Sequence, residues 1–309
     1  MQIPPVYLDQ LMTYASCRGL ASRATEMPKK NSPVTMDEYL NQYERLLRCS
    51  NDPFFGLHFG VFLNLAALGS VYEVSLAATK MGQALRLWSD YAASNFPILS
   101  FDSEGKANSF VLQMDCEVKS TRVKEQIMDT FFTFVHRELR LMLGEQKMDV
   151  ELPYHRLEEY EKWYGTPIRT GETYSFTFDH SIMDIEINKK RKKEIAVLLP
   201  SFLKMISLPG RRYKTFTASV RSMILNMCDP ELPSLDQVAS QFAMTNRTLQ
   251  RKLEGENATF RKVLNDIKEE LHTYLSKGQK IKTKDMAYLL GYSSPSAYLH
   301  ALKKWKEPA

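Results

Sequence analysis

Cysteine is scarce in this chain of 309 residues, and its four cysteines lie far apart. None of them forms a Cys-x-x-Cys pair or stands beside a histidine at metal-ligand spacing. Structural zinc sites are built from such groups, and proteins of reducing compartments keep isolated thiols free. We therefore expect a reducing compartment and no metal for Cys17, Cys49, Cys116 and Cys228.

Long apolar runs are also missing. The longest apolar stretch, 56–76, is broken by His58, Asn64 and Glu73, whereas a membrane span needs about 20 apolar residues. The first residues, MQIPPVYLDQLM, lack the basic segment and apolar core of a secretion signal. We expect a buried helix or helix–loop segment at 56–76, no membrane partner and a cytoplasmic protein.

Motifs of the common enzyme classes are absent as well. The sequence contains no GxxxxGK[ST], GxGxxG, GxSxG or HExxH pattern. Ser201 and Lys204 form an SxxK pattern, but the SDN and KTG elements of acyl-transfer enzymes do not accompany it. We therefore expect no catalytic residue and no cofactor. We also expect no metal ligand among the four histidines that have no second ligand at helical spacing: His58, His136, His155 and His180.

Charge is unevenly distributed along the chain. Residues 210–309 contain 17 Lys or Arg against 10 Asp or Glu, a net charge of +7, which leaves 1–209 at +5 − 7 = −2. A chain of this length fits two domains. The C-terminal part is therefore the candidate for a nucleic-acid partner.

The last hundred residues contain one short pattern twice. The copies lie at about 235–254 and about 283–305, and each begins with an amphipathic stretch that carries a small residue, Ala239 or Ala287. Four residues later another small residue, Ala243 or Gly291, marks a sharp bend. Two amphipathic helices joined in this way are typical of a helix-turn-helix.

A hydroxyl side chain opens the second helix of each copy. Thr245 precedes the run 246–254, and Ser294 followed by Pro295 precedes the run to Trp305. Between the copies, about 259–276 has an apolar face at helical spacing. Eighteen residues at ~1.5 Å each form a rod of roughly 27 Å, close to the ~34 Å repeat of neighbouring major-groove segments.

Polar residues on the outer faces of these second helices are candidates for DNA contacts. Leu249 and Leu253 must face inward, which turns Arg247, Gln250 and Arg251 outward. Arginine matches guanine edges and glutamine matches adenine edges. The second copy is chemically poorer and suits phosphate and shape recognition. An ordinary solvated helix face is the alternative, chiefly for His300. The candidates are Thr245, Asn246, Arg247, Gln250, Arg251, Ser294, Ser296, Leu299, His300 and Lys303.

The first two hundred residues mix helical and strand patterns. The run KKRKK at 189–193 is best interpreted as a solvated turn, and 208–212 is typical of a linker. Aromatic residues could line a ligand pocket, although core packing is the simpler interpretation: Trp88, Tyr91, Phe131, Phe134, Tyr174 and Phe176. Periodicity predicts helices at 39–48, 80–91, 122–143 and 195–206, and strands at 110–118, 174–178 and 183–187.

The C-terminal stretch, from PSLDQVASQFAMTNRTLQRKL to DMAYLLGYSSPSAYLHALKKW, resembles the AraC/XylS family of bacterial transcription regulators. The N-terminal part is similar to the family variant with an α/β, arabinose-binding-like effector domain in place of a cupin, through 52–57 (DPFFGL), Gly60 and 79–85 (TKMGQAL). The chain departs from the family pattern at Lys268, His272, His300 and Leu302. The resemblance implies promoter DNA and RNA polymerase as partners.

Together these patterns predict a mixed α/β N-terminal domain and an all-α C-terminal domain with two helix-turn-helix motifs joined by a long helix. The expected boundaries are 1–207 for effector binding or dimerisation, 208–214 for the linker and 215–309 for DNA binding. We expect a sequence-specific DNA-binding transcription regulator, an activator, whose N-terminal domain senses a small-molecule effector, forms a homodimer, or does both. Two alternatives stay open: a ligand-independent regulator with an assembly scaffold, and an enzyme with a DNA-binding tail.

Overall fold

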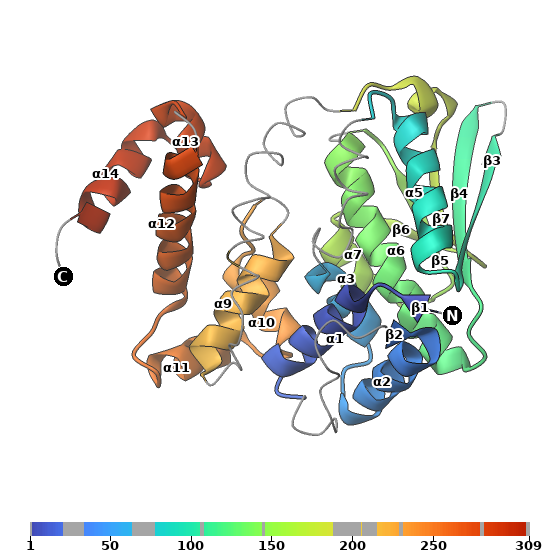
Figure 1. The fold of residues 1–309 in the computed structure, drawn as a ribbon, viewed down its shortest axis with the longest axis horizontal. Coiled ribbons are helices and arrows are strands. Elements are labelled where there is room, and N and C mark those ends of the chain that lie inside the picture. The colour runs from blue at the N-terminus through green and yellow to red at the C-terminus, as the bar shows by residue number, and fades with distance from the viewer. Residues whose placement is uncertain are drawn as a thin grey trace. The chain divides into compact units, whose positions relative to one another are not determined.

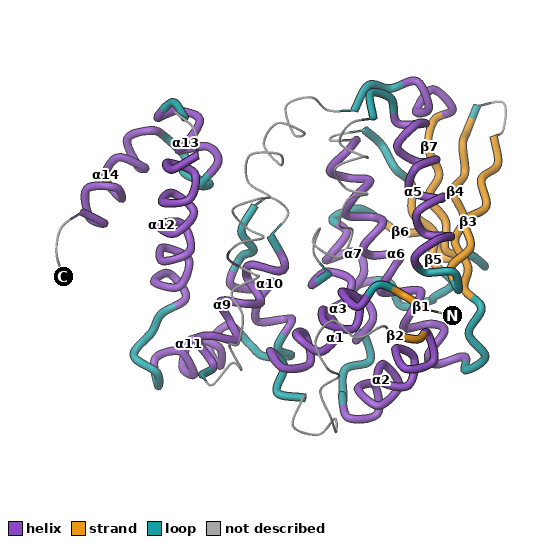
Figure 2. Tube along the Cα trace, viewed as in Figure 1, coloured by secondary structure: helices purple, strands orange, loops and turns teal. Residues whose placement is uncertain are grey.

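The structure, a computed structural model, describes residues 2–20, 34–63, 78–105, 108–143, 146–187, 205, 215–228, 231–278 and 281–306. The chain divides into two compact units, Met1–Ala15 with Gly19–Lys192, and Ser16–Arg18 with Lys193–Ala309. Within the described residues, all named strands belong to the first unit, and the second is built of helices and turns (Figures 1 and 2). A mixed α/β region followed by a helical region, as the sequence predicts, is confirmed.

The main sheet has five strands in the order β3-β4-β7-β5-β6. All neighbours pair antiparallel except β5 and β6, which are parallel. Alternate residues of β4 are buried, as the two-residue period of a strand requires. The strands are β3 (Leu99–Gly105), β4 (Ser109–Cys116), β5 (Asp149–Leu152), β6 (Ile168–Thr170) and β7 (Tyr174–Asp179), and a separate pair joins β1 (Gln2–Ile3) to β2 (Val34–Thr35).

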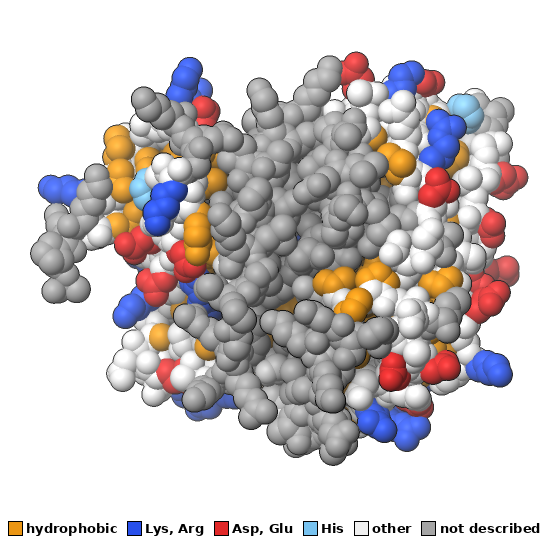
Figure 3. Space-filling view, in the orientation of Figure 1, with side chains coloured by type: hydrophobic (Ala, Val, Ile, Leu, Met, Phe, Trp, Pro, Cys, Tyr) orange, Lys and Arg blue, Asp and Glu red, His pale blue; other side chains and the backbone are white. Residues whose placement is uncertain are grey.

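Strand β3 forms one edge of this sheet, and its exposed side chains include two carboxylates. Asp102 and Glu104 are both exposed, and Figure 3 shows acidic side chains gathered over this edge. Like charges on an edge strand oppose pairing with the same edge of another copy. The β3 edge is therefore poorly suited to join two copies of this chain.

Six α-helices of the first unit are described, and α2 shows how local sequence sets their limits. Thr35 and Glu38 form a reciprocal capping box: Glu38 N donates to Thr35 Oγ1 at 3.2 Å and Thr35 N donates to Glu38 Oε2 at 2.7 Å. The predicted helices at 39–48, 80–91 and 122–143 are confirmed. The helices are α1 (Pro5–Cys17), α2 (Met36–Cys49), α3 (Phe55–Phe62), α5 (Met81–Asn95), α6 (Thr121–Leu143) and α7 (Glu158–Tyr164).

Helices α3 and α6 approach each other at two glycines. A Cβ added at Gly56 would lie 2.1 Å from the carbonyl oxygen of Gln126, and one added at Gly60 would lie 2.5 Å from that of Thr130. Gly56 N also donates to Gln126 Oε1 at 2.7 Å. Only glycine permits this contact, so Gly56 and Gly60 of the buried 55–62 segment set the packing of the core.

One predicted strand is wrong. Residues 183–187 alternate in polarity, but the chain forms a 3₁₀-helix, η3 (His180–Asp184), followed by an isolated bridge between Glu186 and Lys80. Asp179 caps η3, since Ser181 N donates to Asp179 Oδ1 at 2.9 Å. This local capping ends β7 at Asp179 and replaces a strand that the apolar alternation alone favoured.

The second unit contains six described helices. α10 and α13 are short, with seven residues each, and α12 is the longest of the six, with 19. They are α9 (Phe216–Met227), α10 (Leu235–Gln241), α11 (Asn246–Glu254), α12 (Phe260–Gly278), α13 (Thr283–Leu289) and α14 (Pro295–Lys306).

Several predicted segments lie outside the described residues: 64–76 of the long apolar stretch, the basic run 189–193, the SxxK pattern, most of the helix at 195–206 and the linker at 208–214. Within the described residues, no helix combines the length and apolar character needed to cross a membrane.

Candidate nucleic-acid interface

The first helix pair, α10 and α11, is joined by a tight turn. Ser234 caps α10 in a reciprocal box with Gln237, whose backbone N donates to Ser234 Oγ at 3.3 Å. After α10 the chain reverses at Ala243, which has a φ of 50°. Met244 N then donates back to Ala239 O at 3.0 Å. The small residue predicted at this bend therefore occupies a left-handed conformation.

Helix α11 is amphipathic and capped. Thr248 N donates to Thr245 Oγ1 at 3.2 Å, so the predicted hydroxyl cap is formed. Leu249 and Leu253 are fully buried. The five side chains proposed for DNA contact from this helix are all exposed: Thr245, Asn246, Arg247, Gln250 and Arg251.

The second helix pair, α13 and α14, repeats this arrangement with different residues at the bend. Met286 and Ala287 are buried in α13, and the chain reverses at Gly291, which has a φ of 67°. Ala297 N donates to Ser294 Oγ at 3.2 Å, and Pro295 is the first residue of α14. The turn is one residue longer than in the first pair, running over 290–294 instead of 242–245.

Helix α14 buries one aromatic residue and exposes a mixed face. Tyr298 is buried, whereas Leu302 and Trp305 are half-buried. Ser294 is half-buried because it caps the helix. The other four side chains proposed for DNA contact are exposed: Ser296, Leu299, His300 and Lys303.

Helix α12 holds the second pair through the two residues at which it departs from the family pattern. Lys268 Nζ donates to Gly291 O at 3.3 Å and lies 4.3 Å from the centroid of the Tyr292 ring. Burial lowers the pKa of Lys268. His272 Nδ1 lies 3.1 Å from Tyr298 Oη, and its ring centroid is 5.7 Å from that of Trp305. Sequence periodicity does not reveal these contacts, because they join residues more than 20 positions apart.

Three cations on the outer faces form no ion pair with the described residues. Among the residues that the structure describes, Arg247, Arg251 and Lys303 form no ion pair and no hydrogen bond to protein. An exposed guanidinium that is not neutralised by the protein can donate to a base edge or a phosphate without first breaking an internal bond. The faces of α11 and α14 thus present donors outward.

One polar cluster of the N-terminal unit is buried around Asp129. The Asp129 carboxylate accepts hydrogen bonds from Tyr160 Oη at 2.8 Å, Tyr154 Oη at 3.0 Å and Tyr174 Oη at 3.1 Å. Burial raises the pKa of Asp129 to about 7, against the three hydroxyl donors, which lower it. Sequence analysis missed this cluster, because its members come from α6, β7, α7 and the loop after β5.

A second buried group surrounds His58. Its Nδ1 lies 2.7 Å from Asp52 Oδ2 and its Nε2 lies 3.5 Å from Glu159 Oε1. The hydrogen bond from His58 lowers the pKa of Glu159.

His136 stacks on Tyr164 with ring centroids 4.1 Å apart, and burial lowers the pKa of His136 to about 3. Within the described ranges no three His, Cys, Asp or Glu side chains form a metal-binding group.

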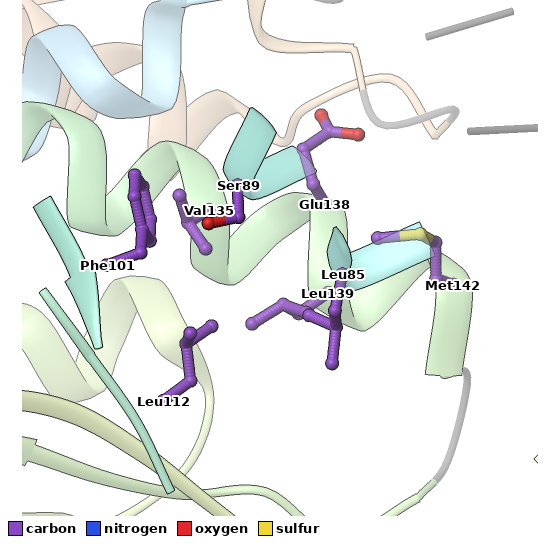
Figure 4. A pocket seen from close by; sticks show the side chains of 8 residues that line it. All are labelled: Leu85, Ser89, Phe101, Leu112, Val135, Glu138, Leu139 and Met142. Carbon is purple, nitrogen blue, oxygen red and sulfur yellow. The ribbon is translucent and has the colours of Figure 1, made fainter. Parts of the chain in front are cut away.

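One small apolar cavity lies between the helices and the sheet of this unit (Figure 4). Its volume is about 20 Å³, far below the ~300 Å³ of small preformed ligand sites. In Figure 4 the Glu138 carboxylate points away from the apolar side chains. The residues around it are Leu85, Ser89, Phe101, Leu112, Val135, Glu138, Leu139 and Met142.

Four of the six aromatic residues considered as pocket-lining are buried in the core. Phe131 and Phe96 have ring centroids 4.2 Å apart, and Phe176 stacks on Phe132 at 4.1 Å. Phe134 and Tyr174 are also buried. The side chains of Trp88 and Tyr91 lie outside the described residues.

Comparison with known proteins finds transcription regulators. The family described as "Arabinose-binding domain of AraC transcription regulator, N-term" matches residues 15–187. The ornithine utilization regulator of Pseudomonas aeruginosa is 20% identical over 98% of this chain and 93% of its own length. An uncharacterized HTH-type transcriptional regulator of Mycobacterium tuberculosis is 32% identical over 31% of this chain and 28% of its own.

Among solved structures, the chain is similar to the transcriptional regulator CdpR from Pseudomonas aeruginosa. The sequence identity is 19%, the TM-score is 0.48, and the match covers 97% of this chain and 95% of that one.

Proposed function

Because this chain belongs to the AraC family of transcription regulators, we propose that it binds promoter DNA through α11 and α14 and activates transcription by contacting RNA polymerase. In this proposal α10–α11 and α13–α14 are two helix-turn-helix motifs, and α11 and α14 are their reader helices. The domain boundaries are those expected from sequence: 1–207, the linker 208–214 and 215–309.

The observation that carries the proposal is the outward-facing, capped surface of the two reader helices. Each is preceded by a left-handed residue and opened by a hydroxyl cap, at Thr245 and at Ser294. The N-terminal turn of a reader helix is the part that enters the major groove. The backbone N–H groups of this turn attract phosphate oxygens, because a helix N-terminus carries partial positive charge.

The two reader helices are assigned different tasks. Arg247, Gln250 and Arg251 of α11 supply paired donors that can distinguish guanine and adenine edges. Ser296, His300 and Lys303 of α14, with the methyl groups of Leu299, suit phosphate contact, groove shape and a thymine methyl. Sequence discrimination is therefore assigned chiefly to α11.

The helix between the motifs has the length to separate two reading positions. α12 contains 19 residues, which at ~1.5 Å per residue span about 28 Å. Neighbouring major-groove segments on one face of B-DNA repeat every ~34 Å. One chain can then contact two successive segments.

Selection from random duplex DNA tests this function. The full chain is used to enrich bound sequences, and its affinity for the enriched duplex and for a scrambled copy is measured at physiological salt by fluorescence anisotropy. We expect the enriched duplex to bind at least about 1,000-fold more tightly, the lower range for specific recognition. Equal affinity for both duplexes would falsify the proposal.

For the N-terminal domain we propose effector sensing, homodimerisation or both. The relative that aligns over nearly its whole length is named as an ornithine utilization regulator, so amino acids and amines are the first compounds to screen. A ligand that binds only the folded state raises the melting temperature. Reproducible stabilisation by one chemical class supports sensing, and sedimentation measures the oligomeric state.

A ligand-independent assembly scaffold is the second candidate for this domain. It is favoured by the aromatic side chains that pack against one another in the core, such as Phe96 with Phe131 and Phe132 with Phe176. In that case no compound shifts the melting temperature, while a dimer is still detected by sedimentation. A monomer that binds no compound contradicts both candidates.

A further inference from the structure

The N-terminus of α9 is held by a carboxylate that follows α11 in the chain. Glu256 Oε1 accepts from Phe216 N at 2.7 Å, and Glu256 Oε2 accepts from Thr217 N at 2.7 Å and Thr217 Oγ1 at 2.6 Å. These bonds, that from the Thr217 hydroxyl above all, lower the pKa of Glu256. Three donors at a helix N-terminus hold a carboxylate more firmly than neutral hydrogen bonds do.

Glu256 is itself fixed to the last turn of α11. Glu256 N donates to Leu253 O at 2.9 Å, and Ala258 N donates to the same oxygen at 3.0 Å. Asn257 between them has a φ of 55°, so the backbone there turns in a left-handed conformation. Leu253 is fully buried. The carboxylate at the start of α9 is thus attached to the anchored end of α11.

The ring of Phe216 makes a second connection at the same place. Its centroid lies 5.2 Å from that of Phe242, which ends α10. Lys252 Nζ of α11 lies 5.1 Å from the Phe216 centroid. The first residue of α9 is therefore in contact with both helices of the first pair. Through Glu256 it is also bonded to the turn that follows α11.

The second pair is held differently. Its turn and its reader helix are fixed on α12 by Lys268 and His272. α12 in turn is joined to the middle of α9 by the ion pair of Arg221 with Glu270. Within the described residues, a disturbance at the start of α9 thus reaches α11 by direct contact, whereas its effect on α14 must pass along α12.

We propose that Glu256 is a positioning residue that fixes α11 against the start of α9 and so sets the orientation in which α11 meets DNA. The carboxylate joins the end of α11 to two backbone donors and one hydroxyl of α9. Loss of this contact is then expected to disturb the recognition of one DNA segment more than that of the other. This inference rests on the proposed function, because α11 must contact DNA for its orientation to matter.

The test compares Glu256→Gln with Glu254→Gln in the full chain. Both variants remove one negative charge near α11, and Glu254 is exposed on the helix itself. Affinities are measured for the enriched duplex and for two derivatives, each with one of its two recognised segments scrambled. The α11 segment is identified with the Arg251→Ala variant: it is the segment whose scrambling no longer lowers the affinity of that variant.

We expect Glu256→Gln to reduce the penalty for scrambling the α11 segment about tenfold, the size expected when a charged hydrogen-bond acceptor is lost. The penalty for the other segment stays within about twofold, since separate contacts hold α14. Glu254→Gln leaves both penalties unchanged. Equal loss at both segments, or equal behaviour of the two glutamine variants, overturns the inference, since a general loss of stability lowers both penalties together.

Thr217→Val is the second variant, and it serves if Glu256→Gln does not fold. It removes the hydroxyl that donates to Glu256 and keeps the side-chain shape. We expect a smaller change at the same segment, and no change there contradicts the inference. If the unmodified chain enriches no preferred duplex, the proposed function fails instead, so the two failures are distinguished.

Discussion

Two polar clusters of the N-terminal unit, around Asp129 and His58, are buried, whereas the polar side chains proposed for DNA contact on α11 and α14 are largely exposed. Asp129 and His58 are almost completely buried and bonded to other parts of the same unit. Arg247, Arg251 and Lys303 are exposed and face no carboxylate among the described residues. Buried polar groups specify a fold, and exposed donors without internal partners are available to another molecule. The N-terminal unit thus uses these polar groups to fix its own fold, whereas α11 and α14 present donors that another molecule can bind.

The largest expected effect breaks the buried side of this comparison at Asp129. Its pKa is about 7 in the folded chain, against an ordinary value of 3.8. The protonated carboxyl is favoured by folding, so its stabilisation is complete below pH ~4 and is lost as pH rises through about 7. Three pKa units correspond to about 4 kcal/mol. We expect Asp129→Asn to remove a decline of this order between pH 4 and 8.

Denaturant unfolding at a series of pH values measures this decline, with the exposed Asp102→Asn as the control for the loss of one charge. The free energy of unfolding is plotted against pH for Asp129→Asn and for the unmodified chain. If the two curves run parallel across the range, Asp129 does not titrate there. His136 acts in the opposite direction, because its lowered pKa adds stability as pH rises from about 3. The difference between the two curves isolates the Asp129 contribution.

The second prediction concerns the contact of α3 with α6. Gly56→Ala places a Cβ 2.1 Å from the Gln126 carbonyl oxygen, and we expect the free energy of unfolding to fall by about 3 kcal/mol, as for other overpacked cores. Gly255→Ala in the C-terminal unit is the matched control, because its nearest atom would be 3.5 Å away. Equal stability of the two variants, measured by denaturant unfolding, would contradict the close packing.

The third prediction sharpens the exposed side. Arg251→Ala is expected to weaken binding to the enriched duplex by about 1–3 kcal/mol and to relax the preference at one base pair. Lys303→Ala is expected to weaken binding to all sequences and to reduce the salt dependence by about one unit of slope. Anisotropy titrations at several salt concentrations measure both. If the two variants behave alike, the division of tasks between α11 and α14 is wrong.

The smallest predicted effect compares the two bends. Gly291 has a φ of 67° and a Cβ there would have room, with its nearest atom, Lys268 Nζ, 3.8 Å away. Gly291→Ala therefore costs backbone strain alone, about 1 kcal/mol. Ala243→Gly relieves strain at a φ of 50°, and we expect a gain below about 1 kcal/mol. Thermal unfolding checks both, and a loss from Ala243→Gly would refute the shared geometry of the bends.

Short-range patterns made much of the C-terminal unit predictable. The caps at Thr245 and Ser294 and the bends at Ala243 and Gly291 all depend on residues within one or two turns. Such signals are contained in a few neighbouring letters of sequence. The resemblance to AraC regulators is confirmed by the family that matches 15–187. DNA contact by the named side chains stays a prediction.

The N-terminal unit was harder to predict because its structure depends on distant residues. β3 was missed since five of its seven residues are exposed, the last four of them in succession, without the alternation of a half-buried strand. The three tyrosines around Asp129 come together only through the pairing of β5 and β7 and the packing of α6 and α7. No spacing along the sequence reveals such a cluster.

Hydroxyl-radical footprinting of the full chain on its enriched duplex tests the central claim most directly. The account predicts two protected segments on one face of the DNA, with centres about one helical turn, ~10 base pairs, apart. It also predicts that Arg251→Ala changes one of them and Lys303→Ala the other. One protected segment, or protection spread evenly over unrelated DNA, would contradict two outward-facing reader helices in one chain.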